Sequence, residues 1–484
     1  MSSIPRDQFG PKELGFRAVI LSWIEPHRRW IVRATVIFAL FTFLSIISAL
    51  LSLNKILYAV ALAVAPLAFA VALLLQAHLE LAPIAILFAG GFIPFSLPTG
   101  TDSRLVIALV LAIMVMGLWL LRMAVIEHRF SLKPSAVNLP FLGFSAITLL
   151  SLIWSNIFRD PSVYVPGKFI VIQVAQAMVM IVSPGITLLI ANFIDKKRQL
   201  QWLVKVMLAI GFLGLITEFT PLNLPVNTGG LTAAWVVALS IGLSLYERNL
   251  HRGWRAALLA IGLLWIVWGF VLHMSWLAGW LPGFVALAVI TFFRSRRMFF
   301  VTVLILGLYV FINKSYINQD LQAESITSGD TRLAAWEFNW SITSQHLLLG
   351  TGPAGYVVYY MTYAPNQAMA THSNYLDILS ETGLLGTIFF LWMFAALAWR
   401  GIKTYWRLRK RGDFYEALAI ASLGGLAGCI VMMGFGDWLI PFAYTQTIAG
   451  FSYTIYSWIF IGALMALDQM LREGKIPAVK SGIS

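Results

Sequence analysis

Long apolar runs, separated by short polar or charged connections, recur along most of the 484-residue chain. A helix needs about 20 apolar residues to cross the hydrocarbon core of a bilayer. Because the runs reach this length, the pattern predicts an all-α, polytopic membrane protein with about 12 to 14 spans. The approximate spans are 34–53, 56–76, 79–97, 105–126, 139–158, 168–194, 200–221, 229–246, 255–272, 277–293, 298–313, 376–399, 415–435 and 446–468.

One long polar connection, residues 314–375, interrupts this series of spans. It divides the chain into an N-terminal segment, 1–33, a block of spans over 34–313, the connection itself, a second block over 376–468, and a tail, 469–484. Within the N-terminal segment, apolar residues follow helical spacing over 16–24 and predict a helix that lies on the membrane surface.

Composition agrees with the membrane prediction. The chain has 59% hydrophobic and 11% charged residues and a mean hydropathy of +0.81, which excludes an ordinary soluble globular protein. Most Lys and Arg residues fall in alternate connections, as expected when those connections are cytoplasmic. The net charge of +13 is therefore explained by topology, and we expect no nucleic-acid partner. The same rule places both termini in the cytoplasm and the connection 314–375 outside it.

The long connection contains the candidate chemistry. Gly350, Gly352 and Gly355 match a dinucleotide-binding pattern, but no strand is predicted before them, so a tight turn is the better interpretation. Arg332 is predicted in the first turn of a helix, where a cation opposes the helix dipole and helix stability does not explain it. A solvated arginine is the alternative.

His372 is predicted at the N-terminus of the helix that enters the span 376–399, with Thr371 or Ser373 as the cap. The positive end of the helix dipole favours the neutral imidazole, which is the form that a general base needs. Asp377 and Glu381, in the first turns, act in the opposite direction. The alternative is an ordinary interfacial histidine.

Three pieces of this region occur in a distinctive order: "RLAAWEF", "LLLGTGPAGY" and "THSNYLDILSETGLLG". Together they resemble the O-antigen ligase and O-antigen polymerase superfamily of bacterial surface-polysaccharide enzymes. The motif region covers roughly residues 328–390. A weaker resemblance extends over the spans from about 139 and includes "LSLIWSNIFRDP".

The resemblance implies a metal-independent, inverting glycosyltransferase of the bacterial inner membrane, with no cofactor. Its donor would be an undecaprenyl-diphosphate-linked glycan. The acceptor would be lipid A core in a ligase or a second carrier-linked glycan in a polymerase, and membrane lipids would surround the protein. By the same resemblance, His372 activates the acceptor hydroxyl and Arg332 holds the diphosphate. Both roles suit the chemistry, since a hydroxyl needs a nearby base and a diphosphate needs cations.

The chain also departs from the family pattern, which commonly has an arginine in each of two further places. The corresponding stretches, "TPLNLPVNTGGLTAA" and "LHMSWLAGWLPG", contain none, and Trp276 follows Ser275 where a Ser-Arg pair is expected. Other outer side chains are therefore candidates for substrate binding: Arg159, Lys168, Lys314, His273 and Asn374.

Three other interpretations compete with this one. A transporter or lipid-carrier flippase would also have many spans, but the predicted spans are nearly free of acidic residues and show no paired halves. A metal-dependent glycosyltransferase would need paired acids in an early outer connection, and "PTGTDSR" at 98–104 offers none. An inactive member of the superfamily is the third alternative, because of the missing arginines.

Overall fold

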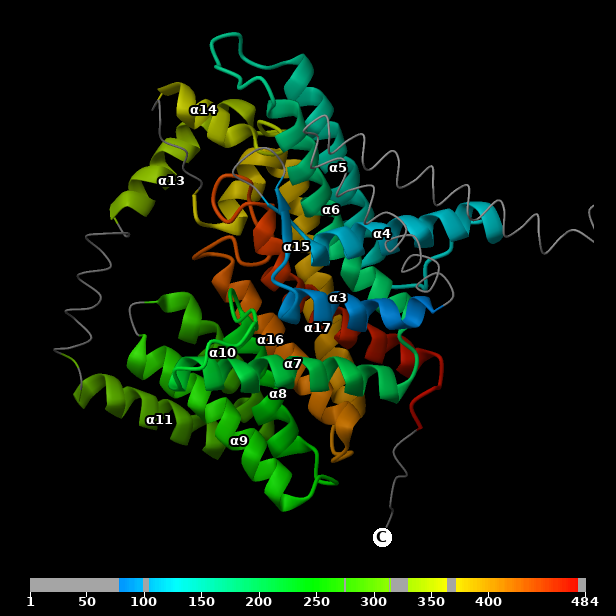
Figure 1. Ribbon diagram of the computed structural model, residues 1–484, viewed down its shortest axis with the longest axis vertical. Coiled ribbons are helices and arrows are strands. Elements are labelled where there is room, and N and C mark those ends of the chain that lie inside the picture. The colour runs from blue at the N-terminus through cyan, green and yellow to red at the C-terminus, as the bar shows by residue number, and fades with distance from the viewer. Residues whose placement is uncertain are drawn as a thin grey trace, which may run out of the picture. The chain divides into compact units, whose positions relative to one another are not determined.

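The computed structural model describes residues 78–98, 104–273, 276–312, 314, 330–363 and 371–477. The spans predicted at 34–53 and 56–76 and the surface helix predicted at 16–24 lie outside these ranges. Within the described ranges, nine helices are long and apolar enough to cross a membrane. The predicted all-α, polytopic membrane fold is thereby confirmed (Figure 1).

Nine long apolar helices lie in the described ranges, and the polar connection 314–375 falls between the sixth and the seventh of them. They are α4 (Ile107–Leu121, continued by a π-helix to Ile126), α5 (Asn138–Ile157), α6 (Phe169–Phe193), α7 (Lys197–Phe219), α9 (Arg252–Val267, continued by a π-helix, η4, Trp268–Leu272), α10 (Leu277–Arg294), α15 (Asn374–Leu408), α16 (Phe414–Met432) and α17 (Phe451–Arg472). Shorter helices are α3 (Ala82–Phe92), α8 (Thr232–Tyr246), α11 (Arg296–Ile312), α13 (Asp330–Thr343) and α14 (Gly355–Tyr363).

The span predicted at 79–97 differs from the structure. Helix α3 ends at Phe92, because Ile93 is extended and precedes Pro94, which disfavours helical backbone in the residue before it. The chain then forms a short antiparallel hairpin from β1 (Ser96–Pro98) and β2 (Arg104–Val106), in which Ser96 pairs with Val106. The third apolar run thus gives a helix of 11 residues and a hairpin instead of one long span.

Helices α6, α8, α16 and α17 form the centre of the described bundle. Nearly every residue of α8 is buried, as expected for a helix that is apolar on all sides. Helix α10 packs against α8 and α16, and α17 packs along α6. Helix α11, in contrast, has no buried residue among those described.

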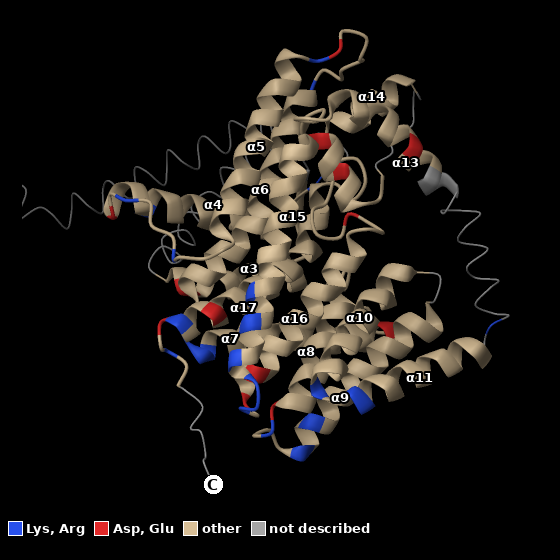
Figure 2. Ribbon diagram, turned by 180° about the vertical axis from the view of Figure 1, so that it is seen from behind, with Lys and Arg blue, Asp and Glu red and all other residues tan. Residues whose placement is uncertain are grey.

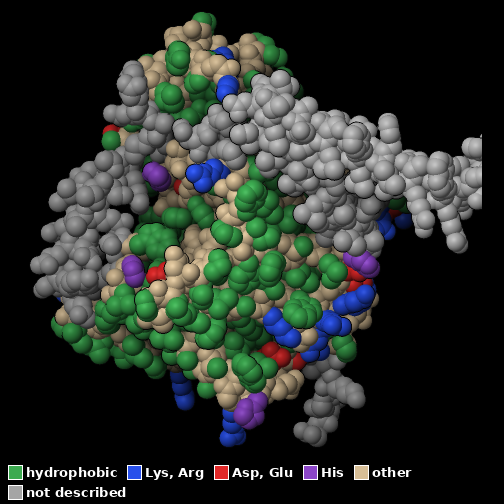
Figure 3. All heavy atoms as spheres, in the orientation of Figure 1, with side chains coloured by type: hydrophobic (Ala, Val, Ile, Leu, Met, Phe, Trp, Pro, Cys, Tyr) green, Lys and Arg blue, Asp and Glu red, His purple; other side chains and the backbone are tan. Residues whose placement is uncertain are grey.

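Basic side chains collect at one end of this bundle (Figure 2). Lys197 and Arg252 begin α7 and α9, whereas Arg294, Arg407 and Arg472 lie in the last turns of α10, α15 and α17. The visible surface of the described helices away from their ends is mainly hydrophobic (Figure 3). Helices α13 and α14 lie away from the basic end and pack against the start of α15.

Candidate functional site

The turn at 350–352 docks against the start of α15, where that helix is broken at Gly383. Gly383 has a φ of +65°, and the carbonyls of Ser380 and Glu381 just before it accept hydrogen bonds from the backbone N–H groups of residues 351 and 352, at 2.8 and 3.0 Å. A Cβ on Gly350 would lie 2.5 Å from the Glu381 carbonyl carbon. The glycine pattern therefore forms a structural turn, as predicted, that braces the beginning of α15.

His372 lies immediately before α15, with Ser373 as the N-cap, which confirms its predicted place at a helix N-terminus. Its backbone is left-handed, with a φ of +52°. The preceding residue holds this turn, because Thr371 donates to Asp377 Oδ1 from both its N–H (3.0 Å) and its hydroxyl (2.7 Å). The Thr371 carbonyl accepts a hydrogen bond from the Trp336 indole of α13 at 2.8 Å. Such a backbone conformation persists only where neighbouring contacts hold it.

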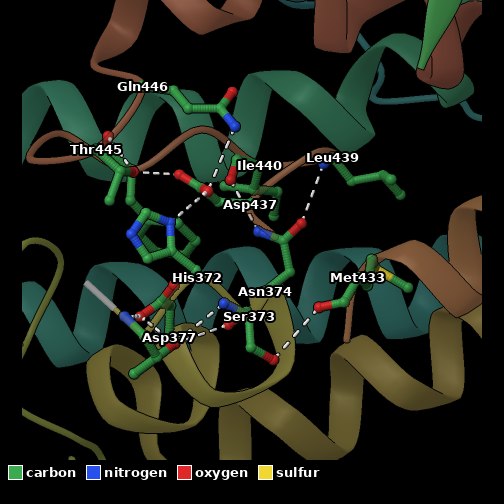
Figure 4. A network of polar contacts seen from close by, with 12 residues as sticks. His372, Ser373, Asn374, Asp377, Met433, Asp437, Leu439, Ile440, Thr445 and Gln446 are labelled. Carbon is green, nitrogen blue, oxygen red and sulfur yellow. Dashed lines mark hydrogen bonds and ion pairs between the residues drawn. The ribbon is translucent and has the colours of Figure 1, made fainter. Parts of the chain in front are cut away.

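An acidic side chain from the connection between α16 and α17 faces the imidazole (Figure 4). Asp437 Oδ1 lies 4.0 Å from His372 Nδ1; the carboxylate is 2% exposed and the imidazole is 42% exposed. The Thr445 hydroxyl donates to Oδ2, and the Gln446 amide donates to Oδ1 at 3.3 Å. Burial raises the pKa of Asp437, while the hydrogen bond from Thr445 and the charge of His372 oppose that rise. We call these two side chains the His372–Asp437 pair.

Nothing local in the sequence links Asp437 to His372, because α15 and α16 separate them along the chain. The one available signal is an acidic residue within the apolar stretch "GFGDWLIP". An acid in such surroundings needs a polar or charged partner, but the sequence does not say which.

Asn374 fastens the connection that carries Asp437 to the start of α15. Its side chain is fully buried; the amide N–H donates to the Ile440 carbonyl at 2.8 Å, and the amide oxygen accepts from the Leu439 N–H at 3.0 Å. Its backbone N–H donates to the Gly436 carbonyl at 3.3 Å. Both ends of the amide predicted to bind substrate are thus occupied by backbone groups of the neighbouring connection.

Two of the predicted cations lie in the connection between α5 and α6. Arg159 donates to Gln173 Oε1 at 3.5 Å, and Lys168 is exposed at the start of α6. One turn further along α6, Gln176 donates to the Pro441 carbonyl at 3.3 Å. Helix α6 therefore contacts Arg159 through Gln173 and the connection that carries Asp437 through Gln176.

The remaining predicted cations come from other elements. Arg332 is in the first turn of α13, one turn before Trp336; its side chain lies outside the described part of the structure. Lys314 is exposed beyond the end of α11, and His273 is exposed after η4. Among the described residues, no hydrogen bond or ion pair joins Lys314 or His273 to His372, and no group of three or more His, Cys, Asp or Glu side chains could hold a metal ion.

Comparison with known proteins bears on the segment that contains these elements. Residues 250–391, from the start of α9 into α15, match the family model described as O-antigen ligase. This segment is therefore similar to the O-antigen ligase family over less than a third of the chain. A search of curated proteins found no match. The similarity supports a ligase- or polymerase-type function in polysaccharide assembly. Arg332 and His372 fall inside the matched segment, and Asp437 falls outside it.

Proposed function

We propose that the protein transfers a glycan from an undecaprenyl-diphosphate carrier to an acceptor hydroxyl, with His372 as the general base. The observation that carries the proposal is the His372–Asp437 pair: a half-exposed imidazole at a helix N-terminus, beside a buried carboxylate. A carboxylate that faces one ring nitrogen orients the imidazole and stabilises the imidazolium that forms when the other nitrogen takes a proton. Asp437 is then a positioning residue for His372.

In the proposed step, His372 Nε2 accepts the proton of the acceptor hydroxyl as its oxygen attacks the anomeric carbon of the donor sugar. The bond between that carbon and the diphosphate oxygen breaks, and the carrier diphosphate leaves with the electron pair. Attack opposite the leaving group inverts the anomeric configuration. The base must lie within hydrogen-bond reach of the acceptor hydroxyl, which the exposed side of the imidazole permits.

The leaving diphosphate needs cationic partners. We assign this role first to Arg332, then to Arg159 and Lys168, with Lys314 and His273 as further candidates. Support for Arg332 is its place on α13, the helix that contacts the residue before His372 through Trp336. Support for Arg159 is its link through α6 to the connection that carries Asp437.

We further propose that the basic end of the bundle faces the cytoplasm and that the His372–Asp437 pair faces the periplasm. The gathering of Lys and Arg at one end supports this orientation, because cytoplasmic connections carry the excess of basic residues (Figure 2). The protein would then lie in the inner membrane and meet its lipid-linked substrates on the outer side.

A transfer assay with the purified full-length protein tests the proposal. The donor is an undecaprenyl-diphosphate-linked glycan, the acceptor is lipid A core or a second molecule of the donor, and the buffer contains a chelator. Product on lipid A core identifies a ligase, and a lengthened carrier-linked glycan identifies a polymerase. We expect His372→Ala to fold and insert normally but to abolish transfer.

The matched control is His346→Gln, which changes a histidine in the turn after α13 whose ring packs against Tyr359. It should transfer at the wild-type rate. Transfer by folded His372→Ala at the wild-type rate would remove the histidine from the mechanism. If the folded wild-type protein makes no product with any donor, a transporter, a flippase or an inactive relative becomes the better account.

A further inference from the structure

Three tryptophans, one on η4 and two in connections, pack together, and one of them directly follows Asp437 in the chain. The Trp276 ring, just before α10, lies 5.8 Å from the Trp268 ring of η4 and 6.3 Å from the Trp438 ring, edge to face in both cases. Trp438 directly follows Asp437 in the chain. Trp276 therefore bridges the end of α9 and the connection that holds the carboxylate partner of the proposed base.

Two exposed polar side chains border these rings. The His273 ring packs against Trp268 at a tilt of 35°, with centroids 4.6 Å apart, and its Nδ1 lies 3.1 Å from the Trp268 carbonyl oxygen. Glu218, at the end of α7, accepts a hydrogen bond from the Trp268 indole N–H at 2.9 Å. We call Glu218, Trp268, His273, Trp276 and Trp438 the aromatic strip.

The strip differs from an ordinary belt of interfacial tryptophans, which extend toward lipid. Trp268 is 6% exposed, and Trp276 and Trp438 are half-buried. Trp254, at the basic end of α9, has the exposure expected of a belt residue, 68%. The rings of the strip thus pack against one another, and Trp438 joins the strip to Asp437 through the chain.

The charge of the strip selects among possible ligands. A diphosphate would be repelled by the Glu218 carboxylate, so the strip is unsuited to the leaving group of the proposed reaction. A lipid acyl chain has no polar group that could form a hydrogen bond with Glu218 or His273. A sugar ring offers apolar C–H faces, which pack on aromatic rings, and hydroxyls, which donate to a carboxylate and exchange hydrogen bonds with an imidazole.

We infer that the aromatic strip binds a pyranose ring of the glycan substrate next to the His372–Asp437 pair, with Trp276 as the stacking surface and Glu218 and His273 as hydroxyl partners. The inference rests on the proposed function for its substrate class. The same chemistry could come from the acceptor glycan or from the donor glycan, and the experiment separates these two sources.

The first measurement is binding without reaction. Purified protein carrying His372→Ala is mixed with the free oligosaccharide released by mild acid from the lipid-linked glycans of the source organism, and saturation-transfer NMR reports contacts to the sugar ring protons. Adding Trp276→Leu should weaken binding about threefold to tenfold, since an aromatic contact is lost while apolar volume is largely kept. Trp276→Phe should retain binding within about twofold.

The matched control is Trp254→Leu, which removes an exposed tryptophan far along α9 and should leave binding unchanged. The inference is overturned if the protein with Trp276→Leu binds the oligosaccharide as tightly as the protein that keeps Trp276, once thermal unfolding shows that both are folded. An equal loss in Trp254→Leu also overturns it, because the effect would then not belong to the strip.

The second measurement is transfer by Trp276→Leu in the otherwise native protein. We expect a threefold to tenfold rise in KM for one substrate with kcat within about twofold, and the substrate affected identifies the source of the bound ring. If the wild type shows no transfer but Trp276→Leu still loses oligosaccharide binding, the proposed function fails and the strip stands. If transfer depends on His372 but neither binding nor KM responds to Trp276→Leu, the strip fails and the proposed function stands.

Discussion

Replacing Asp437 by Asn tests whether the carboxylate acts on His372 through its charge. Asparagine has nearly the same shape and still offers an oxygen to the Gln446 amide, which donates to Oδ1 in the native protein. The Thr445 hydroxyl, which donates to the other oxygen, can rotate to accept from the new amide. The substitution therefore removes the negative charge while it largely preserves the connection.

The size of the effect follows from the separation of 4.0 Å between His372 Nδ1 and Asp437 Oδ1. Two unit charges at about 4 Å interact with roughly 4 kcal/mol at an effective dielectric constant of about 20. The imidazole is 42% exposed, so solvent screening reduces this energy. We take about 1 to 2 kcal/mol as the remaining stabilisation of the imidazolium in the transition state. The corresponding fall in kcat is about 5-fold to 30-fold.

The assay is glycan transfer at saturating donor and acceptor between pH 5 and 9. The imidazolium that forms in the transition state loses its counter-charge in Asp437→Asn, so kcat should fall by this factor across the pH range. Asp160→Asn is the matched control, because this exposed acid lies in the connection between α5 and α6. A wild-type kcat in the folded Asp437→Asn protein would refute the charge argument.

Three further substitutions test the surroundings of the pair. Asn374→Ala should lower the free energy of unfolding by about 2 to 4 kcal/mol, because it leaves two buried backbone groups without partners; an unchanged thermal unfolding temperature would contradict this. Gly383→Ala should lower the free energy of unfolding by at least about 1 to 2 kcal/mol, because alanine is strained at the positive φ of this position. Its control is Gly307→Ala, where the added Cβ meets open space, so the free energy of unfolding should stay nearly the same or rise. Arg332→Lys should raise the KM for the donor more than the KM for the acceptor, because lysine cannot make the two parallel hydrogen bonds of a guanidinium to a phosphate. If the donor KM of Arg332→Lys equals that of the wild type, Arg332 is a solvated residue without a role in donor binding.

Local patterns were sufficient to predict most of the described helices and the position of His372. Helix α15 begins at Asn374, where the sequence places Ser373 before an apolar run, although the Ser373 hydroxyl donates to the Met433 carbonyl and does not cap the helix. The turn at 350–352 was predictable for the same reason, since glycines mark turns wherever they occur. Pro94 indicates that a helix ends near this position, as α3 does. The hairpin that follows is not indicated locally, because it depends on the pairing of two short strands.

The partners of His372 could not be read from the sequence because they depend on tertiary packing. Asn374 stands in a motif that suggested contact with substrate, yet its amide is satisfied by Leu439 and Ile440. A side chain with two good hydrogen-bonding ends gives no local sign of which groups it will meet. Asp437 has the same ambiguity, because an acid near a span end is equally compatible with solvent, a lipid headgroup or a histidine.

The connection between α16 and α17 is where these separate elements meet. Gln176 of α6 and Asn374 of α15 bind its backbone, His372 faces its carboxylate, and Trp276 contacts its tryptophan. The matched family segment supplies His372, Asn374 and Trp276 but ends before this connection begins. Because Gln176 of α6 and Asn374 of α15 hold the backbone of this connection, a change at either residue should act on transfer through the position of Asp437. Such changes should therefore lower kcat, whereas loss of a substrate contact at Trp276 should act mainly on KM.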